Sequence, residues 1–376
     1  MRLNQPNRYK KENEKMVKIK NCKIGIFSDI HWGKSRDNVK KIENNMIFID
    51  WFITEMKSHK IKEIFFLGDW FDHRNSVNVN TGFKAYEAVK KLCKNFKVFM
   101  ILGNHDTYYK NSIEVNSIKQ YESLNNLYII DKDTVIDICG KQLLCTPWGF
   151  NLHSYKNQEY DIMFGHFEPG GAILNQSGIF SRTEQYTMDD LNKIAPLVIS
   201  GHYHTRKEYE TRNGTFVSVG CPLELSWNDY QNTKGYYILD VNNGFEFIEN
   251  KLSPKHIKFF WSKLKRKQEK LLPELIKNNY IKLIVDDKYR YEDIMRIMEA
   301  IQRHNPLSAE PDFIFSINKD LLEDVDLESN TKLKYTKLEY IIKYISKIKP
   351  DEINIEGINK DNLTEKAIGY YNKVNE

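Results

Sequence analysis

Short apolar runs recur along the first two thirds of the chain, separated by polar loops or helical patterns. They predict strands at 23–28, 61–67, 97–102, 160–165, 196–200, 214–220 and 235–240. Several runs are almost continuously apolar, which is typical of strands buried on both faces. The pattern therefore indicates an α/β fold whose core is built from buried sheets with helices between the strands.

Helical spacing of apolar residues fills the gaps between the first strands. A stripe with intervals of three and four residues is formed by Val39, Ile42, Met46, Ile49, Ile53 and Met56. This spacing predicts an amphipathic helix over about 39–56. A second helix is predicted over about 81–96, and a third, shorter one over about 113–124.

Beyond residue 250 the pattern changes. Lysines dominate 251–270, where Phe259, Phe260 and Trp261 are interleaved with them. A small β-α-β unit follows, with predicted strands at 280–285 and 312–317 and a helix at 291–303, and then helices at 336–348 and 361–373. The predicted divisions are a loose basic tail (1–20), a catalytic core (21–250), a basic connector with a small domain (251–317), a linker (318–335) and C-terminal helices (336–376).

Composition narrows the class of protein. The 376 residues carry a net charge of only +5, so charge alone does not indicate nucleic-acid binding. No apolar run is long enough to span a membrane and no secretory signal is recognisable, so we expect a cytoplasmic protein without a membrane partner. The five cysteines form no CxxC pair, and we expect all of them to be reduced: Cys22, Cys93, Cys139, Cys145 and Cys221.

Candidate chemistry lies directly after five of the predicted strands. The clusters are Asp29-Ile30-His31, Gly68-Asp69-Trp70-Phe71-Asp72, Gly103-Asn104-His105-Asp106, Gly165-His166 and Gly201-His202-Tyr203-His204. Each motif alone occurs by chance in many proteins. Because the carboxyl ends of parallel strands meet at one edge of a sheet, all five together predict a single site there.

Carboxylates, imidazoles and an amide oxygen at one edge suit a pair of divalent cations, with manganese favoured and magnesium an alternative. Asp69 is the candidate bridge between the two ions. The other ligands of one ion would be Asp29, His31 and His204, and those of the second Asn104, His166 and His202. Two such ions activate water and hold a phosphate for cleavage.

A separate role is expected for His105, which follows a ligand but need not bind metal. It is placed to protonate the leaving oxygen as a general acid. Asp72 and Asp106 are both candidates to orient its ring. The sequence Gly33-Lys34-Ser35 looks like the end of a P-loop, but the glycine that this motif needs at position 28 is Ser28, so we reject it.

With these motifs the chain resembles the calcineurin-like metallophosphoesterases, whose signature is D-x-H, G-D-x-x-D, G-N-H-D/E, G-H and G-H-x-H. The resemblance implies a two-sheet β-sandwich flanked by helices. It is strongest to the DNA double-strand-break nucleases, the branch of SbcD-like proteins and the nuclease subunit of the T-even phage recombination endonuclease. Residues 68–74 and 218–240 carry that likeness.

This branch implies a nuclease with exonuclease action on duplex DNA ends and endonuclease action on single strands. The resemblance further implies a small DNA-capping domain and C-terminal helices that dock on a coiled-coil, SbcC-like ABC-type ATPase. It also implies a nuclease homodimer within a heterotetramer, in which the helices at 81–96 and 113–124 form the contact. Recombination, replication and repair of DNA are the implied processes. Some relatives have histidine at the position of Asp72.

Alternatives remain open. The chain could be a phosphatase or a small-molecule phosphodiesterase of the same superfamily, although the long C-terminal extension disfavours a small substrate. A non-catalytic scaffold is a third hypothesis, but all presumed ligands and His105 are present. The stretch 251–270 could contact DNA, or its aromatic rings could be buried in a connector. The apolar faces of the terminal helices could pack on the chain itself instead of on a partner.

Overall fold

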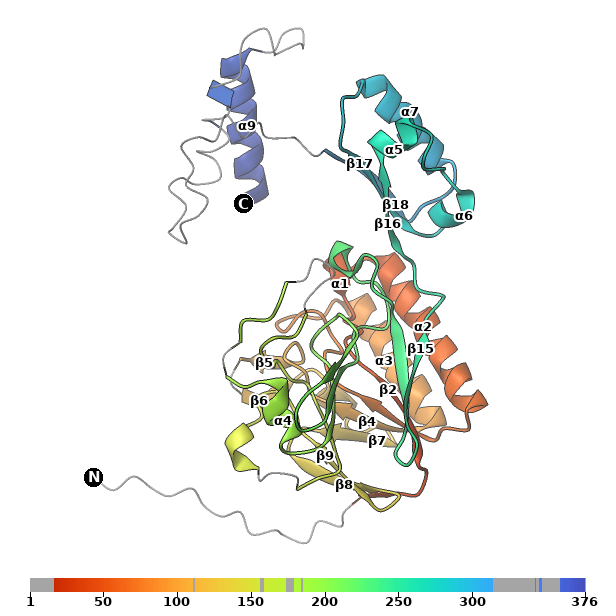
Figure 1. Ribbon diagram of the computed structural model, residues 1–376, viewed down its shortest axis with the longest axis vertical. Helices are drawn as coiled ribbons and strands as arrows, with labels where there is room; N and C mark the ends of the chain where they lie inside the picture. The colour runs from red at the N-terminus through yellow and green to blue at the C-terminus, as the bar shows by residue number, and fades with distance from the viewer. Residues whose placement is uncertain are drawn as a thin grey trace, which may run out of the picture. The chain divides into compact units, whose positions relative to one another are not determined.

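The computed structural model describes residues 17–110, 112–155, 159–173, 179–183, 185–313, 342, 345–346 and 359–375. By its internal contacts the chain forms two units, residues 1–312 and 313–376. Among the described residues, the sheets lie in the first unit, apart from Phe313 at the end of the last strand. The second holds the helix α9 (Lys360–Asn375), drawn in blue in Figure 1.

Two large sheets form the body of the first unit. The strands of one are β2 (Lys23–Phe27), β3 (Glu63–Phe66), β4 (Lys97–Ile101), β7 (Leu127–Ile130), β14 (Gly235–Asp240) and β15 (Gly244–Glu249). The strands of the other are β1 (Val17–Ile19), β8 (Thr134–Ile138), β9 (Lys141–Cys145), β10 (Ile162–Gly165), β11 (Leu197–Ser200), β12 (Lys207–Glu210) and β13 (Thr215–Ser218). Their spatial orders are β15-β14-β2-β3-β4-β7 and β1-β8-β9-β10-β11-β13-β12.

Helices and short turns connect these strands. They are α1 (Lys34–Asp37), α2 (Val39–Ser58), α3 (Val79–Asn95), α4 (Met188–Asn192) and the 3-10 turns η1 (Lys119–Tyr121), η2 (Leu152–Ser154) and η3 (Trp227–Asp229). Within α1 the backbone of Ser35 and Arg36 is left-handed, so this element is a tight turn and not a regular helix. The long helices α2 and α3 pack side by side (Figure 1).

Alternating side chains of the strands build three apolar layers. Ile64 and Phe66 of β3 pack toward α2 and α3, while Phe65 between them packs between the two sheets. On the outer face of the second sheet, Met163 of β10 packs with Leu191 of α4. The core is therefore a two-sheet sandwich with helices on both outer faces, as the sequence predicts, and the nearly continuous apolar runs are explained by burial on both sides.

The predicted elements of the core are largely confirmed. All seven predicted strands are present, as β2, β3, β4, β10, β11, β13 and β14, and α2 and α3 correspond to the first two predicted helices. Six strands of the two sheets were not predicted, namely β1, β7, β8, β9, β12 and β15. β1 has only three residues and β12 is mostly charged, so their sequence signals are weak. The apolar run of β7 and the alternation of apolar and acidic residues in β15 are clearer signals that the sequence analysis overlooked.

The predicted helix at 113–124 is wrong. The segment forms a hairpin of β5 (Thr107–Tyr109) and β6 (Ser112–Asn116), followed by the single turn η1. The β-branched Ile113 and Val115 alternate with polar residues, which favours a strand. The side chain of Asn116 then accepts a hydrogen bond from the backbone N–H of Lys119, so it caps the following turn.

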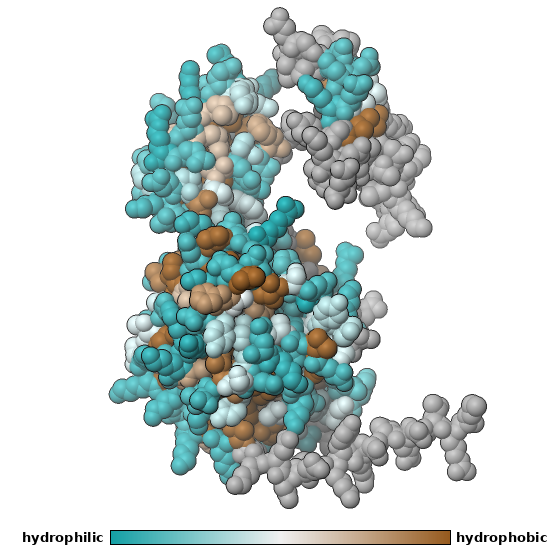
Figure 2. All heavy atoms as spheres, turned by 180° about the vertical axis from the view of Figure 1, so that it is seen from behind, coloured by the Kyte–Doolittle hydropathy of each residue, from teal (hydrophilic) through white to brown (hydrophobic). Residues whose placement is uncertain are grey.

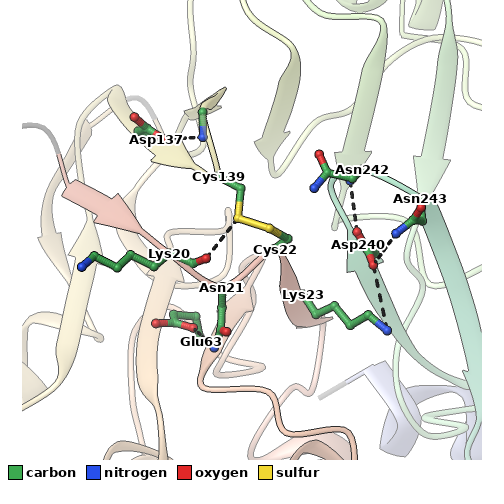
Figure 3. The surroundings of a disulfide bond; sticks show 11 residues. Lys20, Asn21, Cys22, Lys23, Glu63, Asp137, Cys139, Asp240, Asn242 and Asn243 are labelled. Atoms are coloured by element: carbon green, nitrogen blue, oxygen red, sulfur yellow. Dashed lines mark hydrogen bonds and ion pairs between the residues drawn. A yellow bond between two sulfur atoms is a disulfide. The ribbon is translucent and has the colours of Figure 1, made fainter.

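The expectation that all cysteines are reduced is also wrong. Cys22 and Cys139 form a disulfide whose residues are 117 positions apart (Figure 3). Residues 17–19 of the predicted loose tail form β1, which pairs with β8, and the N–H of Cys139 donates to the carbonyl of Ile19. That pairing brings the two cysteines together, and neither it nor β1 can be deduced from cysteine spacing. Residues 1–16 lie outside the described residues.

A small sheet follows the core within the first unit. Its strands are β16 (His256–Phe260), β17 (Tyr280–Val285) and β18 (Ser308–Phe313), and its helices are α5 (Trp261–Lys265), α6 (Pro273–Ile276) and α7 (Tyr291–Gln302). The predicted β17 and α7 are confirmed, whereas the last strand begins four residues earlier than predicted. The stretch predicted as a connector includes β16 and α5, and because Phe259 and Trp261 are buried, these two rings are not free to stack on bases.

The elements predicted for the C-terminal part of the chain can be compared with the structure only where its residues are described. The helix expected at 361–373 is present as α9. The linker at 318–335, most of the helix at 336–348 and residues 314–317 of the last predicted strand lie outside the described residues. Among the described helices, none is both long and apolar enough to cross a membrane. On the face drawn in Figure 2, hydrophilic side chains predominate and hydrophobic ones form separate patches.

We expect the disulfide to stabilise the fold, because it closes a long loop between the two sheets. Reduction, or the substitution Cys139→Ser, should lower the free energy of unfolding by about 2–4 kcal/mol, measured by urea denaturation. Thiol titration of the denatured, unreduced protein should detect the three free cysteines Cys93, Cys145 and Cys221. Five reactive thiols and an unchanged denaturation midpoint would contradict the pairing.

Candidate metal centre

The five polar clusters converge at the carboxyl ends of β2, β3, β4, β10 and β11. Hydrogen bonds tie neighbouring loops together, such as that from the N–H of Asp29 to the carbonyl of Gly68. Asp29, His31 and Asp69 all have positive φ angles, between 48° and 61°. Non-glycine residues rarely adopt this conformation, and it turns both side chains of the D-x-H motif toward one place.

Close packing at this edge explains two of the glycines. A side chain on Gly103 would meet the Asp69 carboxylate at 2.2 Å, and one on Gly201 would meet the hydroxyl of Ser28 at the same distance. The strand ends can therefore approach closely only because these positions lack a Cβ atom.

One group of donors consists of Asp29, His31 and His204, whose ligand atoms lie within 4.8 Å of one another. The Nε2 atoms of His31 and His204 are 3.0 Å apart. Asp29 also accepts hydrogen bonds from the N–H of His202 at 3.1–3.2 Å, which links this group to the last histidine motif. These are the residues that the sequence assigns to the first ion.

The second group surrounds Asn104. Its Oδ1 atom lies 3.0 Å from Nε2 of His166 and 3.0 Å from Nδ1 of His202. These three residues are the ones that the sequence assigns to the second ion. Trp148 stacks on His202 with ring centroids 5.4 Å apart, a contact that the sequence analysis did not anticipate.

Asp69 lies between the two groups. Its Oδ2 atom is 3.6 Å from Nε2 of His31 and 3.4 Å from Nε2 of His166. Its side chain is only 2 % exposed. A carboxylate in this position can reach a cation in either group, so the structure brings all seven predicted ligands together around one shared side chain.

The chemistry of these donors fits divalent cations. Two imidazole nitrogens only 3.0 Å apart, those of His31 and His204, are close enough to be ligands of one cation when both are unprotonated. Two fully buried carboxylates, Asp29 and Asp69, add negative charge that burial alone would disfavour. Oxygen and nitrogen donors in this mixture suit manganese or a similar ion better than a thiolate-preferring one.

Electrostatics reinforce this arrangement. Burial would raise the pKa of Asp69, but His166, His31 and His105 hold it below its ordinary value. Burial and the nearby His31 hold the pKa of His204 well below its ordinary value. The ionised Asp69 and the neutral His204 are in the protonation states that metal binding requires. Other ligands shift the opposite way: burial raises the pKa of Asp29, and the Asp69 and Asp29 carboxylates overcome burial to raise the pKa of His166 to about 9, so an ion would displace a proton there.

Asp106 has a different role from the one expected. Its carboxylate accepts four backbone N–H bonds, with Oδ2 receiving those of Asp69 and Gly103, and Oδ1 those of Trp70 and Phe71. It therefore fixes the loop that carries Asp69 instead of orienting His105. The sequence offers only proximity to His105 at this position, which suggested the wrong partner.

His105 is held by Asp72, but not through the carboxylate. Its Nδ1 atom lies 2.6 Å from the backbone carbonyl of Asp72, which can accept a hydrogen bond from Nδ1–H. The Asp72 carboxylate instead pairs with Lys34 at 2.8 Å and approaches Nδ1 of His31 at 3.3 Å. Burial lowers the pKa of His105, and its ring remains half-exposed beside the donors.

A pocket of about 550 Å³ opens beside His202 and His204. Lys34 and Arg182 line it, together with polar groups of Ser181, Thr183 and Asn228. The sequence analysis considered Lys34 only as part of a rejected P-loop and did not assign it to this site. Glu168 and Asp229 line the same pocket, and Lys34 is paired with Asp72, so the two cations are balanced by carboxylates and the lining is charged but not predominantly cationic.

Comparisons with known proteins agree with this geometry. Residues 22–206 match the family described as calcineurin-like phosphoesterase. Exonuclease subunit 1 of phage T4 is 27 % identical over 248 residues, which cover 63 % of this chain and 68 % of that protein. The SbcD component of the SbcCD nuclease from Staphylococcus epidermidis is 22 % identical over 268 residues, covering 59 % and 66 %. The chain thus matches about two thirds of each relative's length.

Among solved structures, an archaeal phosphodiesterase aligns with 61 % of this chain and 99 % of its own. Its sequence identity is 16 % and its TM-score 0.35.

The role of Asp106 predicts a strong effect of the substitution Asp106→Asn. An amide has one acceptor oxygen, so its NH2 group would face two of the four backbone N–H donors. The free energy of unfolding should fall by about 2 kcal/mol or more in urea denaturation. Asp131→Asn, an exchange at an exposed position, is the matched control. Equal stability of the two variants would contradict the anchoring role.

Proposed function

Residues 22–206 belong to the calcineurin-like phosphoesterases, and we propose on this basis that the protein is a two-metal DNA nuclease that works in a larger complex. The enzyme is a metal-dependent phosphodiesterase. The observation that carries the proposal is the position of Asp69 between two donor groups, 3.6 Å from His31 and 3.4 Å from His166. The two relatives are named as nucleases, which supports a nucleic acid as the substrate, and DNA is the nucleic acid that we propose.

Each ion would be held by four protein ligands. Asp29, His31, His204 and the shared Asp69 would hold one, and Asn104, His166, His202 and Asp69 the other. When bound, such ions lower the pKa of water and neutralise charge on the phosphate. Manganese is the proposed native ion, because the four imidazoles suit it better than magnesium.

The chain's own residues supply the remaining steps. Lys34 and Arg182, which line the pocket beside the donors, would contact the DNA phosphate. The Asp72 carbonyl accepts a hydrogen bond from Nδ1–H of His105, so Nε2 of that ring is the atom that can donate to the leaving oxygen. Because burial lowers the pKa of His105, its protonated form gives up that proton readily.

The relatives are named as subunits, and this supports a partner for the present chain. We propose a coiled-coil, SbcC-like ATPase that binds the C-terminal region, where α9 is the described helix.

The same proposal includes exonuclease action on duplex ends, endonuclease action on single strands, and roles in recombination and repair. The small sheet would act as the DNA-capping domain, and the protein would work in the cytoplasm.

A homodimer is also proposed, with a contact that differs from the one expected at first. Since 113–124 is not a helix, the contact would be formed by α3 and the β5–β6 hairpin. Val79 and Phe83 of α3 are 89 % and 58 % exposed, and Tyr109 and Val115 of the hairpin are also exposed. Exposed large apolar side chains of this kind are typical of an interface between copies.

The central experiment compares substrates in the presence of manganese. The purified chain should degrade linear duplex and single-stranded oligonucleotides, and chelation of the metal should stop the reaction. Hydrolysis of p-nitrophenyl phosphate without any cleavage of DNA, alone or with the partner ATPase, would favour the alternative of a small-molecule phosphatase.

His105→Asn should leave metal binding intact and lower kcat for DNA cleavage by about 10²–10⁴-fold, because the ligands remain and the general acid is lost. Calorimetric manganese titration and single-turnover cleavage measure the two effects. His59→Asn, an exposed histidine away from the donors, is the control. Full activity in the His105 variant would show that another group protonates the leaving oxygen.

Phe83→Glu should separate the dimer, since a buried charge at an apolar contact is costly. Sedimentation should show a dimer for the natural chain and a monomer for the variant. The exposed Lys94→Glu on the same helix provides a matched control. A natural chain that is monomeric at micromolar concentration, without its ATPase, would contradict this part of the proposal.

A further inference from the structure

A buried ion pair lies directly behind the proposed metal site. Lys234 and Asp229 have side chains only 2 % and 3 % exposed, and Nζ of Lys234 lies 2.7 Å from Oδ1 of Asp229. Both belong to the segment 218–240, which the sequence likeness singles out but to which the proposed reaction assigns no role. Charged pairs are rarely buried without a further partner, because removing two charges from water is costly.

The further partner is the backbone of a proposed ligand. Nζ of Lys234 also donates to the carbonyl oxygen of His204 at 2.7 Å. The N–H of Cys221 donates to the same carbonyl at 3.3 Å. Ammonium-to-carbonyl bonds are among the stronger hydrogen bonds, so the peptide unit after His204 is held from behind.

Asp229 in turn fixes the ammonium group. Its Oδ2 atom accepts the N–H groups of Leu225 and Ser226 at 3.0 Å each, and Ser226 caps the turn η3. The carboxylate therefore cannot move without breaking the local backbone structure. The chain of contacts runs from η3 through Asp229 and Lys234 to His204, whose ring lies 3.0 Å from that of His31.

A third metal ion would be another explanation for this cluster. Ligand atoms of His204, Cys221 and Asp229 lie within 4.8 Å of one another. The Lys234 ammonium, however, is already a cation bound to Asp229 at hydrogen-bond distance. A second cation beside it would be repelled, so the cluster is better explained as a support than as a further ion site.

We infer that Asp229 and Lys234 are positioning residues that hold the His204 imidazole in place for the ion shared with Asp29, His31 and Asp69. This inference rests on the proposed metal site. Groups that orient a metal ligand in this way typically contribute 10–100-fold to metal affinity. Their loss should therefore weaken one ion more than the other, since Asn104, His166 and His202 do not contact the pair.

The test is manganese binding, measured by isothermal titration calorimetry without DNA. The natural chain should bind two ions. Lys234→Met should lower the affinity for one ion by about 10–100-fold and leave the other within about twofold. Asp229→Asn retains the lysine beside the His204 carbonyl, so its loss of affinity should be smaller but still measurable, about three- to tenfold. Lys91→Met, which removes a lysine of α3 paired with Asp50 of α2, should bind both ions normally.

The thermal stability of the variants, measured without metal, distinguishes a positioning role of the ion pair from a purely structural one. If Lys234→Met is folded but less stable, and binds both ions as tightly as the natural chain, the inference is wrong. If Lys234→Met does not fold, manganese binding is measured on Asp229→Asn in its place. Unchanged affinity of Asp229→Asn for both ions would also reject the inference. A natural chain that binds two ions but cleaves no DNA would reject the proposed nuclease and leave the positioning role intact.

Discussion

The concentration of buried negative charge around Asp69 is the constraint on which the rest of the site depends. Asp29, Asp69 and Asp106 are at most 2 % exposed, and Asp72 lies beside them. Carboxylates cannot be buried in such numbers unless cations or N–H donors compensate them. The imidazoles, the Lys34 ammonium, the backbone N–H groups and the proposed ions are those compensating groups, and the loops are arranged to supply them.

The groups that balance the charge of each carboxylate indicate its role. Asp106 is satisfied by four backbone N–H groups and serves the fold. Asp72 is satisfied by Lys34 and His31. Asp69 has only one such N–H donor, that of His105 at 2.8 Å, through Oδ1, which leaves Oδ2 directed at the histidines. Asp29 likewise has one backbone N–H donor, that of His202. The two carboxylates least satisfied by the protein itself, Asp29 and Asp69, are thus the two that belong to the proposed ion site.

The core strands and the polar clusters at their ends could be predicted from the sequence, because each is marked by residues within one short segment. Apolar runs such as 97–102 mark buried strands, and a polar cluster at a strand end marks the edge of a sheet. What could not be predicted depends on pairing between distant segments. The Cys22–Cys139 disulfide requires β1 to pair with β8, and the hydrogen bond of His105 goes to a carbonyl, which every residue possesses. Lys234 and Lys34 are single lysines among many, and only the fold shows that they are held by buried or partly buried carboxylates.

Anomalous diffraction from crystals soaked in manganese tests the central claim most directly, because it locates the ions without relying on activity. The account predicts two peaks, one beside Asp29, His31 and His204 and the other beside Asn104, His166 and His202, with the Asp69 carboxylate touching both. One peak only, or peaks remote from Asp69, would contradict it.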